Sequence, residues 1–173
     1  MIELRHYGHN DLPRIRQVLL DVHAGIPEYP PDDPFVRRFP WFVDHWGGRA
    51  GFSCVIGYDA GEPVGFAYGA PLAEGREWWR DHLTPEAGTE RTYAVSELML
   101  RPKWRKSGVA DRLHRALLTD RQEDLAVLLV DTEHPKVQTL YEGWGYGKVG
   151  DQRPFEDSPV YAVMVKRLGE APG

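Results

Sequence analysis

The sequence predicts an α/β or α+β fold with one central mixed sheet, and three observations lead to this prediction. Apolar runs typical of strands alternate along the chain with amphipathic segments typical of helices. Their predicted order is strand, two helices, three strands, helix, strand, helix and final strands. No internal repeat, low-complexity segment or linker interrupts this order in the 173 residues. Residues 1–173 are therefore expected to form a single domain.

The first part of the chain predicts one strand and two helices. Alternation in "IELRHY" indicates a strand, and Asn10 or Asp11 can cap the helix that follows. The apolar stripe of that helix comprises Ile15, Val18, Leu19 and Val22. Four prolines make residues 25–34 a loop. Residues 35–46 predict a short helix that is broken near Pro40.

The middle of the chain predicts a hairpin, an insertion and a strand. Residues 51–70 read as two strands around a turn at 59–62. Residues 71–91 are polar and irregular, and "EWW" at 77–79 suggests that they contain a helix. The run "TYAVSELMLRP" is typical of a strand that ends at Pro102.

The last part of the chain predicts two helices and three strands. A helix is expected over 108–122, with an apolar face formed by Val109, Leu113, Ala116 and Leu117. The continuous apolar run "LAVLLVD" is typical of a strand buried on both faces. His134-Pro135 opens a helix that ends near Gly143, and "YGKVG" and "PVYAVMVKRL" predict the last strands. The tail "GEAPG" is expected to fray.

Composition limits the classes of function. Hydrophobic residues make up 42% and charged residues 27%, as in an ordinary globular protein. The formal net charge of -5 argues against broad nucleic-acid binding. The one cysteine, Cys54, and a start without a signal peptide predict a cytoplasmic protein. No run approaches the ~18 apolar residues of a membrane span, so no membrane partner is expected.

The stretch "WRKSGVADRL" at 104–113 suggests an anion site. A strand, a turn and a helix N-terminus in succession present free backbone N–H groups and the positive end of the helix dipole. Gly108 lets a ligand approach the backbone closely, and Arg105 and Lys106 add mobile positive charge. These features suit a pyrophosphate, while a plain turn with a surface basic pair stays open as the alternative.

Two better-known phosphate motifs do not explain this stretch. The Walker pattern is absent, because no first glycine stands before Lys106-Ser107-Gly108. A literal G-x-G-x-x-G occurs in "GYGKVG" at 145–150. It follows a predicted helix and precedes no helix, whereas a dinucleotide fingerprint follows a strand and opens a helix. We therefore interpret this second match as a decoy.

The loop and a second segment together resemble the GNAT superfamily of N-acetyltransferases. Residues 105–110 match its acetyl-CoA signature R/Q-x-x-G-x-G/A, and "ELMLRPKW" is similar to its central strand. "HPKVQTLYEGWGY" resembles its N-x-x-A-x-x-L-Y-x-x-x-G-F segment, although His134 and Val137 stand where the family often has Asn and Ala. Ser107 replaces a frequent Gly, which is tolerable if its φ is negative. The resemblance implies a GNAT-like mixed, mostly antiparallel sheet flanked by about four helices.

The resemblance also implies cofactor contacts along the chain. The backbone of residues 98–100 would pair with the pantetheine arm where the central strand splays from the strand at 125–131. Backbone N–H groups of the loop would line the pyrophosphate, and His134 would contact the cofactor or cap its helix. The implied cofactor-binding residues are Leu98, Met99, Leu100, Arg105, Lys106, Ser107, Gly108, Val109, Ala110, Asp111, His134 and Tyr141.

The implied reaction is direct attack of an amine on the acetyl-CoA thioester. An alkylamine near pKa ~10 is mostly protonated at neutral pH, so a base is useful. Glu97 is the candidate base, or else it anchors the substrate ammonium or is a buried pairing residue. An amide near Met99 would polarise the thioester carbonyl. Tyr141 would protonate the leaving thiolate, with aromatic packing as the alternative.

The acceptor is not readable from the sequence. A small amine such as a polyamine or an aminoglycoside-like antibiotic, or a peptide amine, fits the composition. The candidate acceptor contacts are Tyr29, Trp41, His45, Trp78, Trp79 and Glu97, although packing explains at least half of the tryptophans. The histidines are scattered without H-E-x-x-H, so no metal is expected. Other interpretations are a CoA-binding sensor without catalysis and a transferase for a longer acyl-CoA. A homodimer is left open.

Overall fold

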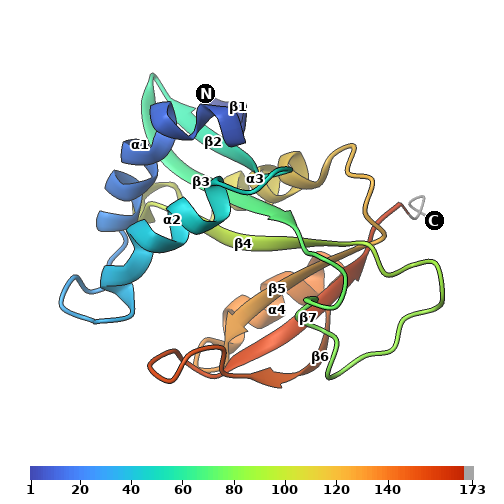
Figure 1. Ribbon diagram of the computed structural model, residues 1–173. Coiled ribbons are helices and arrows are strands. Elements are labelled where there is room, and N and C mark those ends of the chain that lie inside the picture. Colours follow the sequence, from blue (N-terminus) through green and yellow to red (C-terminus); the bar gives the residue numbers. More distant parts are fainter. Residues whose placement is uncertain (170–173) are drawn as a thin grey trace. The chain divides into compact units, whose positions relative to one another are not determined.

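The computed structural model describes residues 1–169 and confirms the predicted fold class. One mixed sheet has the strand order β1-β2-β3-β4-β5-β7-β6, and four α-helices accompany it (Figure 1). The strands are β1 Ile2–Gly8, β2 Ser53–Asp59, β3 Glu62–Pro71, β4 Thr92–Leu100, β5 Leu125–Asp131, β6 Gly147–Gln152 and β7 Tyr161–Arg167. The helices are α1 Leu12–Ala24, α2 Phe39–Gly47, α3 Val109–Leu118 and α4 Pro135–Gly143. Most of the tail expected to fray, residues 170–173, lies outside the described residues.

The chain divides into two compact units. One comprises Met1–Ala70 and Ser96–Asp120, and the other comprises Pro71–Val95 and Arg121–Gly173. The division falls inside β4, whose first half belongs to the second unit and whose second half belongs to the first. The candidate base and the candidate cofactor loop therefore both lie in the first unit.

In the first unit, helices cover both faces of the β1–β3 sheet. Antiparallel register pairs Ile56 with Phe66 and Gly57 with Gly65, so these two pairs point to opposite faces. Phe39 of α2 packs 6.4 Å from the Phe66 ring, which places α2 on the first face. On the other face, Leu113 of α3 lies within van der Waals reach of the space above Gly57. Most of the apolar residues that the sequence assigns to α1 and α3 are buried, whereas Val18 and Ala116 are half-buried.

Two helices of the first unit differ in extent from the prediction. Pro40 lies in the first turn of α2, where its missing N–H is not needed, so it helps to begin this helix and does not break it. The residues before it form a separate 3₁₀ turn, Val36–Arg38. α3 ends at Leu118 and not at 122, because Thr119 is extended and Asp120 has a φ of 61°. A left-handed residue cannot continue an α-helix.

The second unit is built around β5 and β7. These strands pair antiparallel from Leu125↔Arg167 to Asp131↔Tyr161, and their central residues are fully buried. β4 joins β5 in parallel through the pairs from Thr92↔Leu125 to Ala94↔Val127. The strand predicted at "LAVLLVD" is confirmed, and successive buried residues 125–128 show that both of its faces are covered there.

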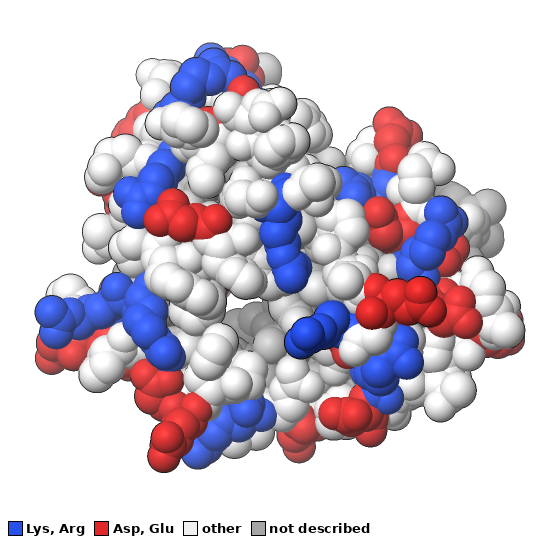
Figure 2. Space-filling view, viewed as in Figure 1, with Lys and Arg blue, Asp and Glu red and all other residues white. Residues whose placement is uncertain are grey.

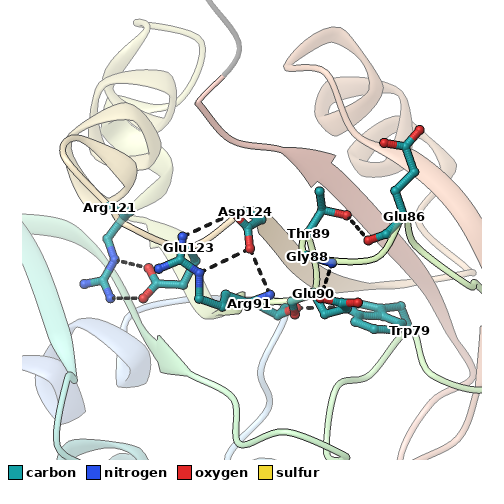
Figure 3. A network of polar contacts seen from close by, with 10 residues as sticks. Trp79, Glu86, Gly88, Thr89, Glu90, Arg91, Arg121, Glu123 and Asp124 are labelled. Carbon is teal, nitrogen blue, oxygen red and sulfur yellow. Dashed lines mark hydrogen bonds and ion pairs between the residues drawn. The ribbon is translucent and has the colours of Figure 1, made fainter.

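The segment between β3 and β4 contains turns and no helix, so the predicted helical insertion is wrong. Side-chain contacts hold it instead. Trp79 is buried, and its indole N–H donates to the Thr92 hydroxyl at 2.9 Å. Figure 3 shows the end of the segment tied to the start of β5, where Arg91 donates through both its backbone N–H and its guanidinium to Asp124. Few apolar residues stand at helical spacing here, so these polar contacts decide the local structure.

The literal G-x-G-x-x-G at 145–150 has a structural explanation in the second unit. Gly145 has a φ of 99° in the turn after α4, and Gly147 begins β6. A side chain at Gly150 would collide with the His82 ring. No helix follows these glycines within the described residues, which confirms that the match is a decoy.

Candidate active site

The loop between β4 and α3 has an unusual backbone. Gly108 is the N-cap of α3 and has a φ of 83°, and Lys106 has a φ of 61°. Ser107 is not among the described residues with positive φ. A serine can therefore stand here in place of the glycine that is frequent in the family. The Ser107 hydroxyl donates to the Trp104 carbonyl, which tightens the turn. The left-handed geometry at 106 and 108 explains why the turn needs a glycine.

The first turn of α3 presents unpaired amides to this loop. The first intrahelical bond runs from Arg112 N to the Gly108 carbonyl at 3.1 Å. The N–H groups of residues 109–111 therefore precede any intrahelical acceptor. A side chain built on Gly108 would meet no atom within 4 Å, so the space beside this turn is open. Open space, aligned amides and the helix dipole are what an anionic group such as a phosphate requires.

Arg105 differs from the mobile cation that the sequence suggested. Its guanidinium forms a two-pronged ion pair with Glu28, and its Nε donates to the Leu100 carbonyl at 3.2 Å. The hydrogen bond and charge of Glu28 raise the pKa of Arg105. Arg105 therefore ties the loop to the segment after α1, and its charge is already paired.

Lys106 is a further cation of the loop, which also contains Arg101 and Lys103. Its side chain is exposed, and no ion pair to it is found among the described residues. On the face shown in Figure 2, basic and acidic side chains are interspersed in small groups. Asp111 in the first turn of α3 pairs with Arg115 at 3.1 Å, so this carboxylate is partly neutralised. Lys106, directly before Ser107 and Gly108, is the cation that lies nearest in sequence to the first turn of α3.

Glu97 lies in the second half of β4 and keeps part of its surface accessible. Burial of its carboxyl group raises the pKa to about 8. A raised pKa follows because a low-dielectric environment disfavours the charged form. A carboxylate with a pKa near neutrality is a better proton acceptor than an ordinary one. Met99 and Leu100, next along this strand, are buried, whereas Leu98 is half-buried.

Tyr68 of β3 is a buried residue near Glu97 that the sequence analysis did not single out. Its side chain is fully buried, and its hydroxyl forms no hydrogen bond among the described residues. Burial raises its pKa well above 10, and the charge of Glu97 adds to this shift. The hydrophobic alternation around "GFAYGA" predicts a buried tyrosine but gives no sign of its neighbour, because the two residues lie 29 positions apart.

The second unit contains Tyr141 and His134, which the family resemblance implies as cofactor contacts. Tyr141 of α4 is buried, and its ring packs edge-to-face with Trp144 and Tyr146 at 5.2 and 5.7 Å. His134 is the N-cap residue of α4, as one of the two expectations had it, but its side chain makes no capping hydrogen bond. Its Nε2 lies 3.7 Å from the Asp131 carboxylate.

Three candidate acceptor contacts lie on or near the helices of the first unit. Tyr29 stacks on His23 with ring centroids 5.0 Å apart, and His23 stacks on Phe39 at 3.9 Å. Burial in this stack lowers the pKa of His23 to about 4. Trp41 is 55% exposed and stacks on His45 at 4.9 Å. These contacts form two stacks, and Trp41 and His45 are the exposed rings among them.

The two tryptophans of the insertion differ from one another. Trp78 is half-buried, whereas Trp79 is only 2% exposed and makes its hydrogen bond within the core of the second unit. This environment favours packing for Trp79 over the acceptor contact expected from the sequence.

No group of three or more His, Cys, Asp or Glu that could hold a metal ion occurs in residues 1–169. No helix in the same range is long and apolar enough to cross a membrane.

Comparison with known families identifies the class of protein. Residues 14–146 match the Acetyltransferase (GNAT) family, which covers the loop, the candidate base and the α4 segment. The chain belongs to this family, whose members are acyltransferases. A search of curated proteins finds no match.

Solved structures show the same fold. Arabidopsis thaliana NAA60 in complex with acetyl-CoA has a TM-score of 0.69 and 16% identity, over 98% of this chain and 100% of that chain. The ribosomal-protein-S18-alanine N-acetyltransferase from Escherichia coli has a TM-score of 0.66 and 14% identity, over 99% and 97%. A GNAT family structure from Desulfovibrio desulfuricans has a TM-score of 0.69 and 15% identity, over 96% and 99%. At this identity the likenesses establish the fold alone.

Proposed function

We propose that the protein is an N-acetyltransferase that moves an acetyl group from acetyl-CoA to a primary amine of a small molecule or peptide. The observation that carries this proposal is the loop at 105–110, where a left-handed Gly108 opens α3 within the segment that matches the GNAT family. A relative of the same fold has been solved with acetyl-CoA. We further propose that residues 1–173 act as one functional domain. We also propose that the protein is cytoplasmic, because a single cysteine, Cys54, is typical of a reducing compartment.

The cofactor loop is proposed to bind the diphosphate through backbone amides. Val109, Ala110 and Asp111 would donate their N–H groups, and Lys106 would add charge. Open space beside Gly108 lets the diphosphate approach. The backbone of residues 98–100 would accept and donate hydrogen bonds along the pantetheine arm, and His134 would lie against the cofactor.

Glu97 is proposed to take the proton from the acceptor amine. Acetyl-CoA, when bound, supplies an activated acyl group as a thioester. A raised pKa suits Glu97 to accept a proton near neutral pH, whereas an ordinary carboxylate is too weak a base. The Met99 amide would donate to the carbonyl oxygen, and Tyr141 would return a proton to the departing sulfur. The proton lost by nitrogen and the proton gained by sulfur balance.

A peptide amine is one acceptor class that the relatives support. The Escherichia coli relative is a ribosomal-protein-S18-alanine N-acetyltransferase, and the NatC complex was solved with a Gag peptide and CoA. The aromatic surface of Tyr29, Trp41 and His45 would contact either an apolar side chain or a cationic amine. Trp78 would be a further contact to the acceptor.

The proposal is tested by acetyl transfer to a panel of amines. The purified protein is incubated with acetyl-CoA and a polyamine, an aminoglycoside or peptides with free N-termini, and release of the CoA thiol is followed. Transfer to at least one class is expected, and propionyl-CoA in parallel tests the acyl preference. Binding of acetyl-CoA without transfer to any amine would instead favour a CoA-binding sensor.

A further inference from the structure

The Tyr68 hydroxyl is an orphaned polar group in the interior of the first unit. The side chain has no exposed surface, and its ring is held by Phe66, with stacked centroids 5.8 Å apart, and by Phe52 at 5.6 Å. Ser96 lies near enough to influence the hydroxyl, but the pair does not reach hydrogen-bond geometry. A buried hydroxyl without a partner lowers stability, so this group calls for an explanation.

The strand geometry places Tyr68 beside Glu97. Arg101 N donates to the Val64 carbonyl at 2.8 Å, and a side chain at Gly65 would collide with the Met99 carbonyl and Leu100. From Val64 to Gly65 the residue number on β3 rises, while that of the contacted residue at the end of β4 falls from 101 to 100. The two strands are therefore antiparallel here. Continuing this register by four residues would place Tyr68 on β3 opposite Glu97 on β4, and the effect of the Glu97 charge on the pKa of Tyr68 agrees with this placement. Residues opposite one another share a face of the sheet.

We propose that Tyr68 is a positioning residue for Glu97, with its hydroxyl donating a hydrogen bond to the Glu97 carboxylate whenever that carboxylate is ionised. A rotation of the Glu97 side chain completes the contact. The inference rests on the proposed function in assigning Glu97 as the base. Tyr68 would hold the ionised carboxylate in one orientation and make ionisation easier near neutral pH.

The surroundings leave Tyr68 as the donor best suited to this role. Cys54 is paired with Tyr68 across β2 and β3, is fully buried, and has a thiol whose pKa is raised by burial. The charge of Tyr29, from the segment after α1, would also raise the pKa of Tyr68. Glu28, next to Tyr29 in the chain, forms an ion pair with Arg105. Because Tyr68 stays protonated throughout the working range of pH, it remains a donor.

A direct test follows the titration of Glu97 by NMR of carboxyl groups in protein labelled at glutamate. Glu97→Gln identifies the resonance by its disappearance. Tyr68→Phe removes one oxygen, and the matched control Tyr58→Phe removes a hydroxyl that hydrogen-bonds Tyr7 at 2.9 Å in the same unit. We expect the midpoint of Glu97 to rise by about half to one pH unit in Tyr68→Phe and to stay unchanged in Tyr58→Phe. An unchanged or lower midpoint in Tyr68→Phe would overturn the proposal.

Thermal unfolding and acetyl transfer distinguish a failure of this proposal from a failure of the proposed function. Tyr68→Phe should unfold at the same or a higher temperature than the wild type, because it loses an unpaired hydroxyl. A larger loss of stability than in Tyr58→Phe would reveal a structural hydrogen bond and would also overturn the proposal. In acetyl transfer, the acidic limb of kcat/KM should move upward with the NMR midpoint, and activity at pH 7 should fall about three- to tenfold. If the wild type transfers no acetyl group, the proposed function fails, while the titration still decides whether Tyr68 acts on Glu97.

Discussion

Arg105 and Glu28 form a two-pronged ion pair, with nitrogen–oxygen distances of 2.5 and 3.0 Å. The pair joins the segment after α1 to the cofactor loop of a GNAT family chain. Because Arg105 also donates to the Leu100 carbonyl, it links that segment to the end of β4. The first residue of the acetyl-CoA signature thus has a structural partner, and Glu28 places a negative charge close to the proposed diphosphate site.

Glu28→Gln should therefore strengthen the binding of acetyl-CoA. Loss of the carboxylate leaves Arg105 unpaired and raises the positive potential of the loop, so we expect affinity to rise about two- to threefold at low salt. The gain should vanish at high salt. Isothermal titration calorimetry measures both, and Glu3→Gln, which removes the partner of Arg5 on β1, is the control. Weaker binding in Glu28→Gln would show that Glu28 organises the loop for the cofactor.

Gly108→Ala should lose acetyl-CoA affinity for a conformational reason. Its φ of 83° costs a residue with a Cβ about 1–2 kcal/mol, although no atom obstructs the new methyl group. Gly61→Ala in the β2–β3 turn provides the matched control, because Gly61 also has a φ of 83° and open space around it. Both variants should lose similar stability in thermal unfolding, but only Gly108→Ala should lose affinity, about tenfold. Equal affinities for the two variants would contradict the assigned loop.

Acetyl transfer should depend on the ionisation of Glu97. Since its pKa is raised to about 8, the fraction of ionised carboxylate grows through neutral pH, and kcat/KM should rise until roughly that pH and then level off. Glu97→Gln should lower kcat by about a hundredfold or more and abolish this rise. A pH–rate profile of both proteins checks the prediction, and a wild-type rate that is independent of pH between about 6 and 9 would contradict the assignment of Glu97 as the base.

The same group should make stability depend on pH. The folded protein holds the Glu97 proton up to about pH 8, whereas the unfolded chain releases it near the ordinary value of 4.5. Between these values the folded state binds more protons, so the contribution of Glu97 to stability falls as pH rises. Glu97→Gln lacks this loss. Its Tm relative to the wild type should therefore increase from about pH 5 to about pH 9. A constant difference would show that burial does not raise this pKa.

Trp79→Phe should destabilise the fold. It removes buried volume and the hydrogen bond to Thr92, so a loss of about 2–3 kcal/mol is expected. Trp41→Phe, at a residue that is 55% exposed, should cost less than about 0.5 kcal/mol. Denaturant unfolding measures both values. Equal stability of the two variants would indicate that Trp79 is not a core residue.

The sequence predicted regular elements well where the apolar pattern was strong. The alternation and continuous runs of β1–β3 and β5, and the Pro135 start of α4, are confirmed. The predicted helix in residues 71–91 was wrong. The buried Trp79 is held by a hydrogen bond to Thr92 and by tertiary packing, and such contacts leave no pattern of helical spacing in the sequence. The family signature located the loop, but the partner of Arg105 lies 77 residues away and left no trace in the local pattern. Tyr68 was missed for the same reason, since only sheet register brings it opposite Glu97.

Binding of acetyl-CoA to the purified protein tests the central claim most directly. Calorimetric titration should give one site per chain with a dissociation constant between about 1 μM and 1 mM, displaced by free CoA. The same titration of Gly108→Ala should show markedly weaker binding, and Gly61→Ala should match the wild type. Absence of binding by the wild type at millimolar acetyl-CoA, or equal binding by all three proteins, would contradict the account.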